Sequence, residues 1–173
     1  MSHLKNFQKE LMAAGFDAAV VSSELNQRYL SGFNYTDGYV LVTPESAWLL
    51  ADFRYTEAAE MQLDKSEFEL VEPKGMLGGL LKIMKENSIT KVAVEEDTLS
   101  IALFEEMKES FGKDICLVGG ASKILNKIRA IKDKAELDTM ARAQEITDRA
   151  FEHILGFINP DRTEIEVALE LEF

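Results

Sequence analysis

Hydrophobic positions in the first part of the chain alternate between two spacings, one typical of helices and one typical of short strands. Near the N-terminus an apolar stripe at helical spacing predicts a helix that ends before Gly15; its members are Leu4, Phe7, Leu11 and Met12. The uninterrupted apolar run 18–21 then predicts a buried strand. We therefore expect the chain to begin with a helix followed by a strand.

The next segment predicts a short helix, a loop and a hairpin. Asn26 opens a helical turn that Gly32 ends, and the polar segment 34–38 predicts a loop. The apolar runs 39–43 and 47–51 have the composition of strands and are separated by only three residues, which is the spacing of a β-hairpin. We expect these two strands to pair antiparallel.

Helices and strands continue to alternate up to about residue 118. Helices are expected after Asp52, which can act as an N-cap, over 76–87, and after Thr98 or Ser100, either of which can cap the third. Strands are predicted at 68–71, 92–94 and 115–118. Strands separated by helices, with one hairpin near the start, predict an α/β domain in which helices flank a mixed β-sheet.

From Ser122 onward the pattern is helical only. Asp133 followed by Glu136 predicts a capping box at the start of a long helix. The apolar stripe of this helix repeats every three or four residues and comprises Met140, Ala143, Ile146, Ala150, Ile154 and Phe157. Such a stripe requires cover, which either the α/β domain or a second copy of the chain could provide.

The last segment, 163–173, fits two structures. The alternation at 164–167 is typical of a strand, whereas Ile165 and Leu169 fit a helix, and Thr163 with Glu166 forms a capping-box pattern that favours the helix. Negative side chains are unfavourable at the C-terminal end of a helix, where the helix dipole is negative. The last segment nevertheless carries four acids: Glu164, Glu166, Glu170 and Glu172. We therefore expect further sequence after Phe173, with the working chemistry of a longer parent protein located there.

Composition and charge exclude two classes of partner. The chain has 31 Asp and Glu against 19 Lys and Arg, a formal net charge of −12, and no basic run. Nucleic-acid binding depends on clustered Lys and Arg, so we expect no nucleic acid partner. No apolar run reaches membrane-spanning length, and the N-terminus lacks the apolar core of a signal peptide. The sequence therefore predicts a cytoplasmic protein with no membrane partner.

Few residues could carry catalysis. His153 has no second His or Cys at metal-ligand spacing and is interpreted as a surface residue. Cys116 has apolar neighbours and is interpreted as a small buried hydrophobe in a strand rather than a reactive thiol. The Gly-x-Ser-x-Gly motif of serine hydrolases is also missing from the sequence. We expect neither a catalytic residue nor a metal ligand in this chain.

Two further clusters have ordinary explanations. Gly75, Gly78 and Gly79 lie between a predicted strand and a helix, where a phosphate could bind, but their spacing matches no nucleotide-binding motif. We favour a flexible turn with close packing. The three acids at 95–97 could hold a cation, and we favour a solvated turn instead.

Five segments carry motifs that are specific when taken together. The most informative is Asn26-Gln-Arg-Tyr-Leu-Ser-Gly-Phe33, and the others are 37–44, Asp52-Phe-Arg-Tyr55, 128–137 and 158–168. In this order they resemble the N-terminal domain of the creatinase and Xaa-Pro peptidase family, the pita-bread metallopeptidases. The first resembles that family's Asn-x-Arg-Tyr-Leu-x-Gly-Phe segment, and the last its Pro-Gly-x-Thr-Glu start of the catalytic domain, with an aspartate where glycine is usual.

The resemblance implies a domain organisation and an absent active site. It implies a creatinase-type, ribonuclease H-like α/β domain at 1–128, followed at 129–173 by a linking helix and the start of the catalytic domain. The family's site holds two divalent metal ions (Mn, Co or Zn) on residues that, by position, are not in this chain. The intact parent would be a homodimer that cleaves Xaa-Pro peptides, whereas this chain alone would be inactive.

The resemblance also gives a role to the loop before the hairpin. In the family this loop closes one side of the substrate pocket, often that of the partner subunit; the candidate residues are Phe33, Asn34, Tyr35, Thr36 and Asp37. Asp52, Arg54 and Tyr55 are the candidate supports. Arg54 could anchor the turn through Asp52, or Asp52 could only cap the following helix. We expect the loop to be exposed, so that replacing Tyr35 or Asp37 changes peptide kinetics without affecting folding.

Two alternatives to this function stay open. One is a stand-alone α/β module that binds a small ligand. The other is the N-terminal domain of a creatinase-like or catalytically silent relative, which serves assembly only. These residues do not distinguish a dipeptidase from an aminopeptidase.

Overall fold

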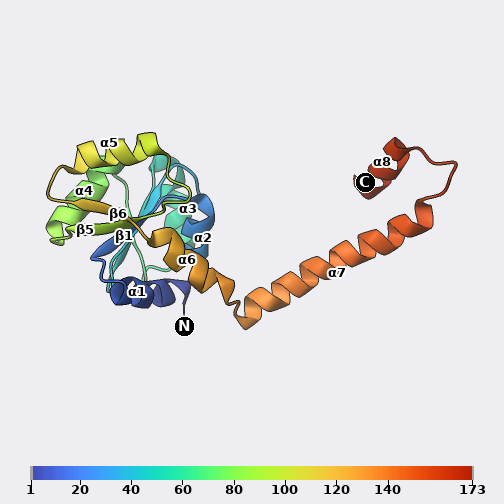
Figure 1. Cartoon of the computed structure of the whole chain (residues 1–173), viewed down its shortest axis with the longest axis horizontal. Helices are drawn as coiled ribbons and strands as arrows, with labels where there is room; N and C mark the ends of the chain where they lie inside the picture. The colour runs from blue at the N-terminus through green and yellow to red at the C-terminus, as the bar shows by residue number, and fades with distance from the viewer. Residues whose placement is uncertain (1, 173) are drawn as a thin grey trace. The chain divides into compact units, whose positions relative to one another are not determined.

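The computed structural model describes residues 2–172, and the chain divides into two compact units, Met1–Ala130 and Ile131–Phe173. Among the described residues, the first unit contains six strands and six helices, and the second contains two helices (Figure 1). The first unit holds the sheet and the candidate loop.

The first unit is built on a mixed sheet with the strand order β4-β3-β2-β1-β5-β6. Its strands are β1 (Ala18–Val21), β2 (Tyr39–Val42), β3 (Ala47–Leu50), β4 (Glu69–Val71), β5 (Lys91–Val94) and β6 (Cys116–Gly119). β2 pairs antiparallel with both β1 and β3, and the remaining neighbours are parallel. The predictions of an α/β fold with a mixed sheet and of the antiparallel hairpin are confirmed.

Helices cover both faces of this sheet. They are α1 (His3–Ala13), α2 (Glu24–Ser31), α3 (Phe53–Gln62), α4 (Met76–Glu86), α5 (Ile101–Phe111) and α6 (Ala121–Ala130). Residues of α1, α2, α3 and α6 form one hydrophobic cluster with the sheet, and residues of α4 and α5 form another. The domain is therefore a three-layer sandwich with the sheet in the middle.

The apolar run at 18–21 is explained by this layering. Ala19 and Val21 belong to the cluster on the α1 side, whereas Ala18 and Val20 belong to the cluster on the α4 side. A strand that is buried on both faces needs apolar residues at every position, because successive side chains point to opposite faces. The prediction of a buried strand is thus confirmed.

Two burial predictions are wrong. Met12 is 59% exposed, because it directly follows Leu11 in α1 and consecutive residues of a helix point in different directions. Cys116 is also exposed. It is the first residue of β6, an edge strand with a neighbouring strand on one side only. The apolar residues next to it in sequence therefore do not ensure that its own side chain is buried.

The second unit consists of α7 (Lys134–Phe157) and α8 (Glu164–Glu172). The predicted capping box begins α7, since the Asp133 side chain accepts a hydrogen bond from the Glu136 N–H and the Glu136 side chain accepts one from the Asp133 N–H. Thr163 and Glu166 make the same reciprocal bonds before α8, so the helical interpretation of this segment is confirmed.

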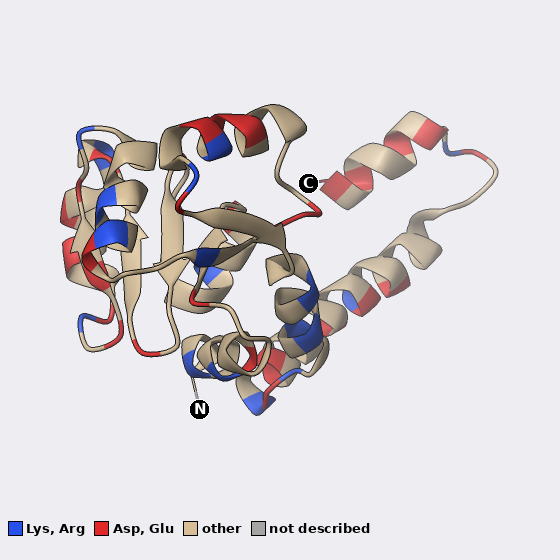
Figure 2. Ribbon diagram, turned by 60° about the vertical axis from the view of Figure 1, so that its left-hand side comes forward, with Lys and Arg blue, Asp and Glu red and all other residues tan. Residues whose placement is uncertain are grey.

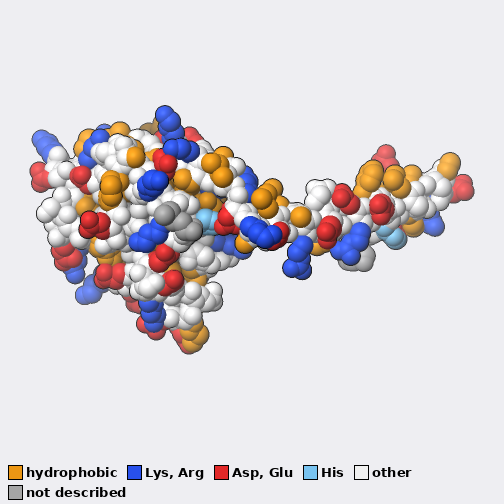
Figure 3. All heavy atoms as spheres, turned by 90° about the horizontal axis from the view of Figure 1, so that it is seen from below, with side chains coloured by type: hydrophobic (Ala, Val, Ile, Leu, Met, Phe, Trp, Pro, Cys, Tyr) orange, Lys and Arg blue, Asp and Glu red, His pale blue; other side chains and the backbone are white. Residues whose placement is uncertain are grey.

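Apolar side chains remain at the surface of both helices of the second unit (Figure 3). Met140 and Ile146 of the predicted stripe are more than half exposed, whereas Ile154 is buried. His153 lies on the surface and contacts Glu170 of α8 at 2.7 Å. Among residues 2–172, no helix is both long and apolar enough to cross a membrane.

Candidate functional site

The candidate loop connects α2 to β2 and begins where α2 ends. Gly32 closes the helix in a left-handed conformation with φ of 71°, which glycine adopts without strain. The loop then alternates, because Phe33 and Tyr35 are buried whereas Asn34 and Asp37 are exposed. Only part of the loop is therefore available to a substrate or a partner.

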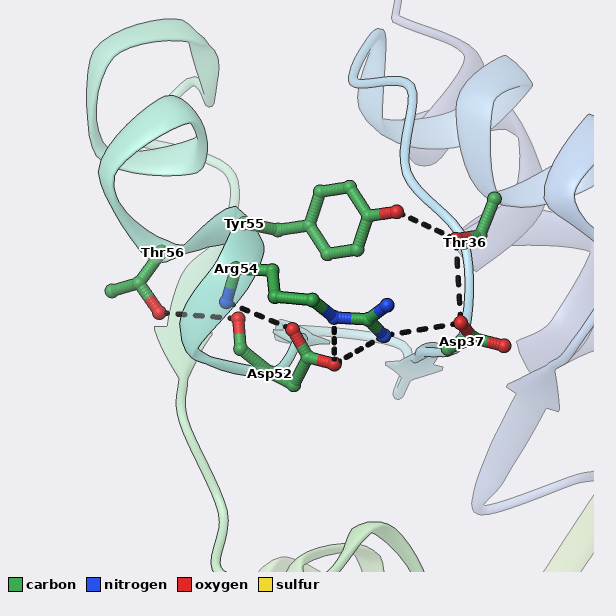
Figure 4. A network of polar contacts seen from close by, with 6 residues as sticks. All are labelled: Thr36, Asp37, Asp52, Arg54, Tyr55 and Thr56. Carbon is green, nitrogen blue, oxygen red and sulfur yellow. Dashed lines mark hydrogen bonds and ion pairs between the residues drawn. The ribbon is translucent and has the colours of Figure 1, made fainter.

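Two contacts to α3 hold the exposed end of the loop (Figure 4). The Arg54 guanidinium lies 3.1 Å from the Asp37 carboxylate, and the Thr36 and Tyr55 hydroxyls lie 2.6 Å apart. Asp37 has a positive φ of 58°, a conformation that Asp tolerates better than most side chains. We call this group of Thr36, Asp37, Asp52, Arg54 and Tyr55 the clasp.

Asp52 performs both of the roles that the sequence left open. One carboxylate oxygen caps α3 by accepting a hydrogen bond from the Arg54 N–H at 2.9 Å. The other accepts from the Arg54 Nε at 2.8 Å, so the guanidinium is fixed before it reaches Asp37. The side-chain hydrogen bonds from Arg54 lower the pKa of Asp52 below its ordinary value, and those bonds raise the pKa of Arg54.

The two carboxylates of the clasp do not fit a divalent metal ion. Asp37 and Asp52 both bind the Arg54 guanidinium, which occupies the position that a cation would take between them. A bound arginine already neutralises the charge that a metal requires. The clasp is therefore a support for the loop rather than a metal centre.

Aromatic packing holds the buried part of the loop, so the expectation of a fully exposed loop is wrong for Phe33 and Tyr35. The Tyr35 ring stacks on Phe33 with centroids 5.4 Å apart and meets the edge of Tyr55 at 6.1 Å. Burial raises the pKa of Tyr35. These two aromatic residues belong to the hydrophobic cluster on the α1 side of the sheet. Their burial could not be predicted from the polar loop sequence, because the residues that bury them lie outside the loop.

The end of the loop is fixed by a close approach at Gly38. A Cβ atom at this position would lie 2.3 Å from the Tyr35 ring and 2.4 Å from the Leu50 carbonyl oxygen, so only glycine fits. The buried Gln27 side chain donates a hydrogen bond to the Gly38 carbonyl at 2.8 Å. Sequence reasoning missed this role of Gln27, although the residue lies within the Asn26–Phe33 motif.

Glu96 and Asp97 are exposed residues of a turn, as predicted for the segment 95–97, but Glu95 is only 1% exposed. Its carboxylate accepts hydrogen bonds from the backbone N–H groups of Ser22 and Ser23, from both hydroxyls, and from the Asn26 amide at 2.6 Å. These donors stand at the N-terminus of α2, where negative charge is favoured. The carboxylate thus fixes the start of the helix that leads into the loop.

Asn26 extends this buried network to α6. Its side-chain oxygen accepts a hydrogen bond from Arg129 at 3.0 Å, while its nitrogen donates to Glu95. The first residue of the Asn26–Phe33 motif is therefore a bridge between a carboxylate and a guanidinium. Arg129 lies in the 128–137 motif segment, whereas no local signal marks Glu95, which acts on residues distant in the sequence.

The glycine cluster at the start of α4, where Gly78 and Gly79 lie in the helix, has a packing role at one position. A Cβ on Gly79 would lie 2.5 Å from the Pro73 side chain, whereas Gly75 and Gly78 have open space around them. Gly75 precedes α4 without a side-chain cap. Close packing against Pro73 therefore explains the glycine at position 79, and no bound phosphate is needed to account for it.

Comparison with known proteins shows the family of the chain. The profile of the Creatinase/Prolidase N-terminal domain matches residues 3–131. An uncharacterized peptidase of Bacillus subtilis, YqhT, is 32% identical over 92% of this chain and 44% of its own length. An Xaa-Pro dipeptidase of Pyrococcus horikoshii is 27% identical over 91% of this chain and 42% of its own.

Solved structures are similar to the whole described chain. An Xaa-Pro dipeptidase from Bacillus anthracis has a TM-score of 0.86 at 34% identity, covering 98% of this chain and 47% of that protein. An X-Pro aminopeptidase from Thermotoga maritima has a TM-score of 0.80 at 28% identity, covering 99% and 48%. The chain spans about half the length of the curated relatives it matches. Its profile match, its fold and its motifs together show that the chain belongs to the creatinase/prolidase N-terminal domain family.

Proposed function

We propose that this chain is the N-terminal part of an Xaa-Pro peptidase, either a dipeptidase or an aminopeptidase, in which it serves dimerisation and closes one side of the substrate pocket. The similarity to Xaa-Pro dipeptidases and an X-Pro aminopeptidase supports the peptidase class. The pocket role is assigned to the loop 33–37. We assign the catalytic chemistry to sequence outside this chain, as the resemblance to the pita-bread metallopeptidases implies.

The observation that carries the pocket role is the contrast within the loop. Phe33 and Tyr35 anchor it in the core, the clasp holds its end, and only Asn34 and Asp37 are exposed at its tip. A polar tip on a fixed base can meet a substrate without first paying the entropy of ordering. This arrangement suits a pocket wall better than a flexible connector.

The intact protein would bind two divalent metal ions, Mn, Co or Zn, which would supply an activated hydroxide and polarise the peptide carbonyl. The clasp does not provide their ligands, since its two carboxylates bind Arg54. We therefore expect the 173-residue chain alone to cleave no Xaa-Pro dipeptide when Mn²⁺ is added. Turnover by a preparation free of host peptidases would contradict this.

The loop is tested in the intact protein that contains this chain. We expect Asn34→Ala and Asp37→Ala to change KM for Xaa-Pro peptides, with an effect that depends on peptide length, because both side chains are exposed at the tip. The matched control is Glu57→Ala, an exposed residue of α3 outside the clasp. Unaltered kinetics across a series of peptide lengths would show that the loop is only a connector.

Tyr35 is not a suitable position for this test. Its ring is buried against Phe33 and fills the space beside Gly38. Truncating a buried aromatic side chain costs about 3–5 kcal/mol of stability, so a kinetic effect of Tyr35→Ala would not be separable from damage to the fold. This replaces the expectation that the Tyr35 substitution leaves folding intact.

The dimerisation role rests on the apolar surface of the second unit. The exposed apolar residues of α7 and α8 are Leu137, Met140, Ile146, Phe151, Leu155, Ile165, Leu169 and Leu171. Large exposed apolar surfaces usually mark interfaces. We expect the sedimentation coefficient of the chain to rise with concentration and to rise less in an Ile146→Glu variant. A monomer mass that is independent of concentration would contradict self-association.

A further inference from the structure

Among residues 2–172, no strand pairs with the outer edge of β4. β4 is the outermost strand beside β3, with Trp48 opposite Glu69 and Leu50 opposite Val71. The Val71 carbonyl accepts a hydrogen bond from the Ala51 N–H at 3.1 Å. Alternate residues of a parallel strand direct their N–H and C=O to the same neighbour, so those of Leu70 face away from β3. A free N–H and C=O pair is a template for another strand.

A hollow borders β4 on each face of the sheet. The hollow on the α3 side has a volume of about 550 Å³ and the one on the α4 side about 680 Å³; both include Trp48 and Glu69 in their walls. Leu70 and Val71 are only partly buried, whereas Leu49 and Leu50 of β3 are fully buried. The helices α3 and α4 therefore leave the edge of the sheet partly uncovered.

The geometry of these hollows matches an added strand. Leu70 packs with the hydrophobic cluster on the α3 side, and Val71 packs with the cluster on the α4 side. A strand that paired with β4 would alternate in the same way. Every second side chain would enter the hollow on the α3 side, and those between them would enter the hollow on the α4 side.

The hollow on the α3 side is strongly acidic. Acidic residues also outnumber basic ones along α5, which carries three glutamates and one lysine (Figure 2). The walls of this hollow contain one lysine, Lys65, and five glutamates, of which Glu69 and Glu72 also line the hollow on the α4 side: Glu45, Glu60, Glu67, Glu69 and Glu72. Three of these acids bind neutral donors, namely the Ser2 hydroxyl, the Trp48 indole N–H and the Thr56 hydroxyl. Such donors leave the negative charge in place.

We propose that β4 and its two hollows form a docking surface for an extended peptide segment with Lys or Arg at alternate positions. Its backbone would pair with Leu70, and its basic side chains would enter the acidic hollow. A second copy of β4 is disfavoured as the occupant, because pairing would bring Glu69 and Glu72 of the two copies together. This inference does not rest on the proposed peptidase function.

The first test uses a synthetic peptide as the probe. Fluorescein-labelled acetyl-Lys-Val-Lys-Val-Lys-Val-amide is titrated with the 173-residue chain at low ionic strength, and anisotropy is measured. We expect saturable binding that weakens with salt, together with slower hydrogen exchange at the Leu70 amide in the complex. Absence of saturable binding, or an unchanged Leu70 exchange rate, would overturn the proposal.

Two controls separate a specific edge from general attraction. Glu60→Lys reverses an exposed charge in the wall of the acidic hollow and should weaken binding about tenfold, whereas Glu57→Lys, on α3 but outside the hollow, should have little effect. Equal losses in the two variants would show that net charge alone attracts the peptide. A peptide with alternate N-methylated residues keeps its charge but cannot pair, so its undiminished binding would also overturn the proposal.

Discussion

Two carboxylates of the first unit each fix the N-terminus of a helix, but they do so in opposite environments. Glu95 lies in the interior and accepts hydrogen bonds at the start of α2 from residues that lie 69 to 73 positions away in sequence. Asp52 lies near the surface and caps α3, the helix that immediately follows it. Together they hold the two helices that border the candidate loop.

The difference between them concerns what each contact contributes. The clasp around Asp52 and Arg54 is open to water, so its ion pairs add little stability and are screened by salt. Glu95 and Asn26 are buried and Ser22 and Ser23 are partly buried, so loss of the carboxylate would leave donors with little access to water unsatisfied. The buried network should therefore determine whether the region folds, and the exposed clasp should determine where the loop tip lies.

The largest expected effect comes from removing the buried carboxylate. Glu95→Ala leaves the Ser22 and Ser23 N–H groups and the Asn26 amide without their acceptor, and we expect a loss of about 4 kcal/mol in the free energy of unfolding. Urea denaturation followed by circular dichroism measures it. The control is Glu57→Ala, an exposed glutamate, and a loss below about 1 kcal/mol in Glu95→Ala would remove the distinction between the two networks.

A smaller effect is expected when the exposed cap is removed. Asp52→Ala deletes the acceptor of the Arg54 N–H and both side-chain contacts to the guanidinium. Loss of an N-cap should lower the thermal midpoint of a domain of this size by about 3 °C. Scanning calorimetry measures the shift, and Asp52→Asn is the matched variant, since Asn retains the capping function. A decrease as large as that of Glu95→Ala would contradict the comparison.

The ionic part of the clasp should depend on pH. The pKa of Asp52 is lower in the folded chain than in the unfolded chain, so its contribution is present above about pH 4 and is lost as pH falls through the folded-state pKa. The difference in thermal midpoint between the wild type and Asp52→Asn should therefore shrink between pH 5 and strongly acidic pH. A difference that stays constant over this range would show that the ion pair does not contribute.

The smallest effect is expected at the tip of the loop. Asp37→Asn removes one exposed ion pair with Arg54 but keeps a residue type that tolerates the positive φ. We expect the thermal midpoint to change by less than about 1 °C, and the change to vanish in about 1 M salt. In NMR spectra, the amide signals of 34–37 should shift far more than those of α2. A large, salt-independent loss of stability would mean that the tip is part of the core.

Local features of the fold were predictable because their partners are close in sequence. The Asp52 cap, the hairpin between β2 and β3, and the Asp133–Glu136 capping box each involve residues a few positions apart. In such cases the sequence pattern itself contains both partners of the interaction. Of the supports suggested by resemblance to a family, Arg54 and Tyr55 contact the loop and Asp52 acts through Arg54, although the role of the loop at a substrate pocket stays a prediction.

Features that depend on distant residues were not predictable. Three consecutive acids at 95–97 have the composition of a solvated turn, and only the position of β1 beside β5 brings Ser22 and Ser23 to Glu95. The sequence places Tyr35 in a polar loop and gives no sign of its burial, which results from packing against Phe33 and Gly38. Cys116 shows the reverse case, since its apolar neighbours suggest burial while its edge strand leaves it exposed.

The central place of β1 in the sheet also bears on the order in which the domain folds. β2 and β3 are joined by a short turn and can pair within microseconds, because closing a small loop costs little entropy. β1 must instead find β5 across a large stretch of chain, and that parallel pairing forms only after the intervening hairpin and helices are accommodated. The register of Ala19 with Ala93 is therefore the expected rate-limiting contact, and the Glu95 network would assemble at the same moment. Mutations in the hairpin should mainly speed unfolding, whereas mutations between β1 and β5 should slow folding itself.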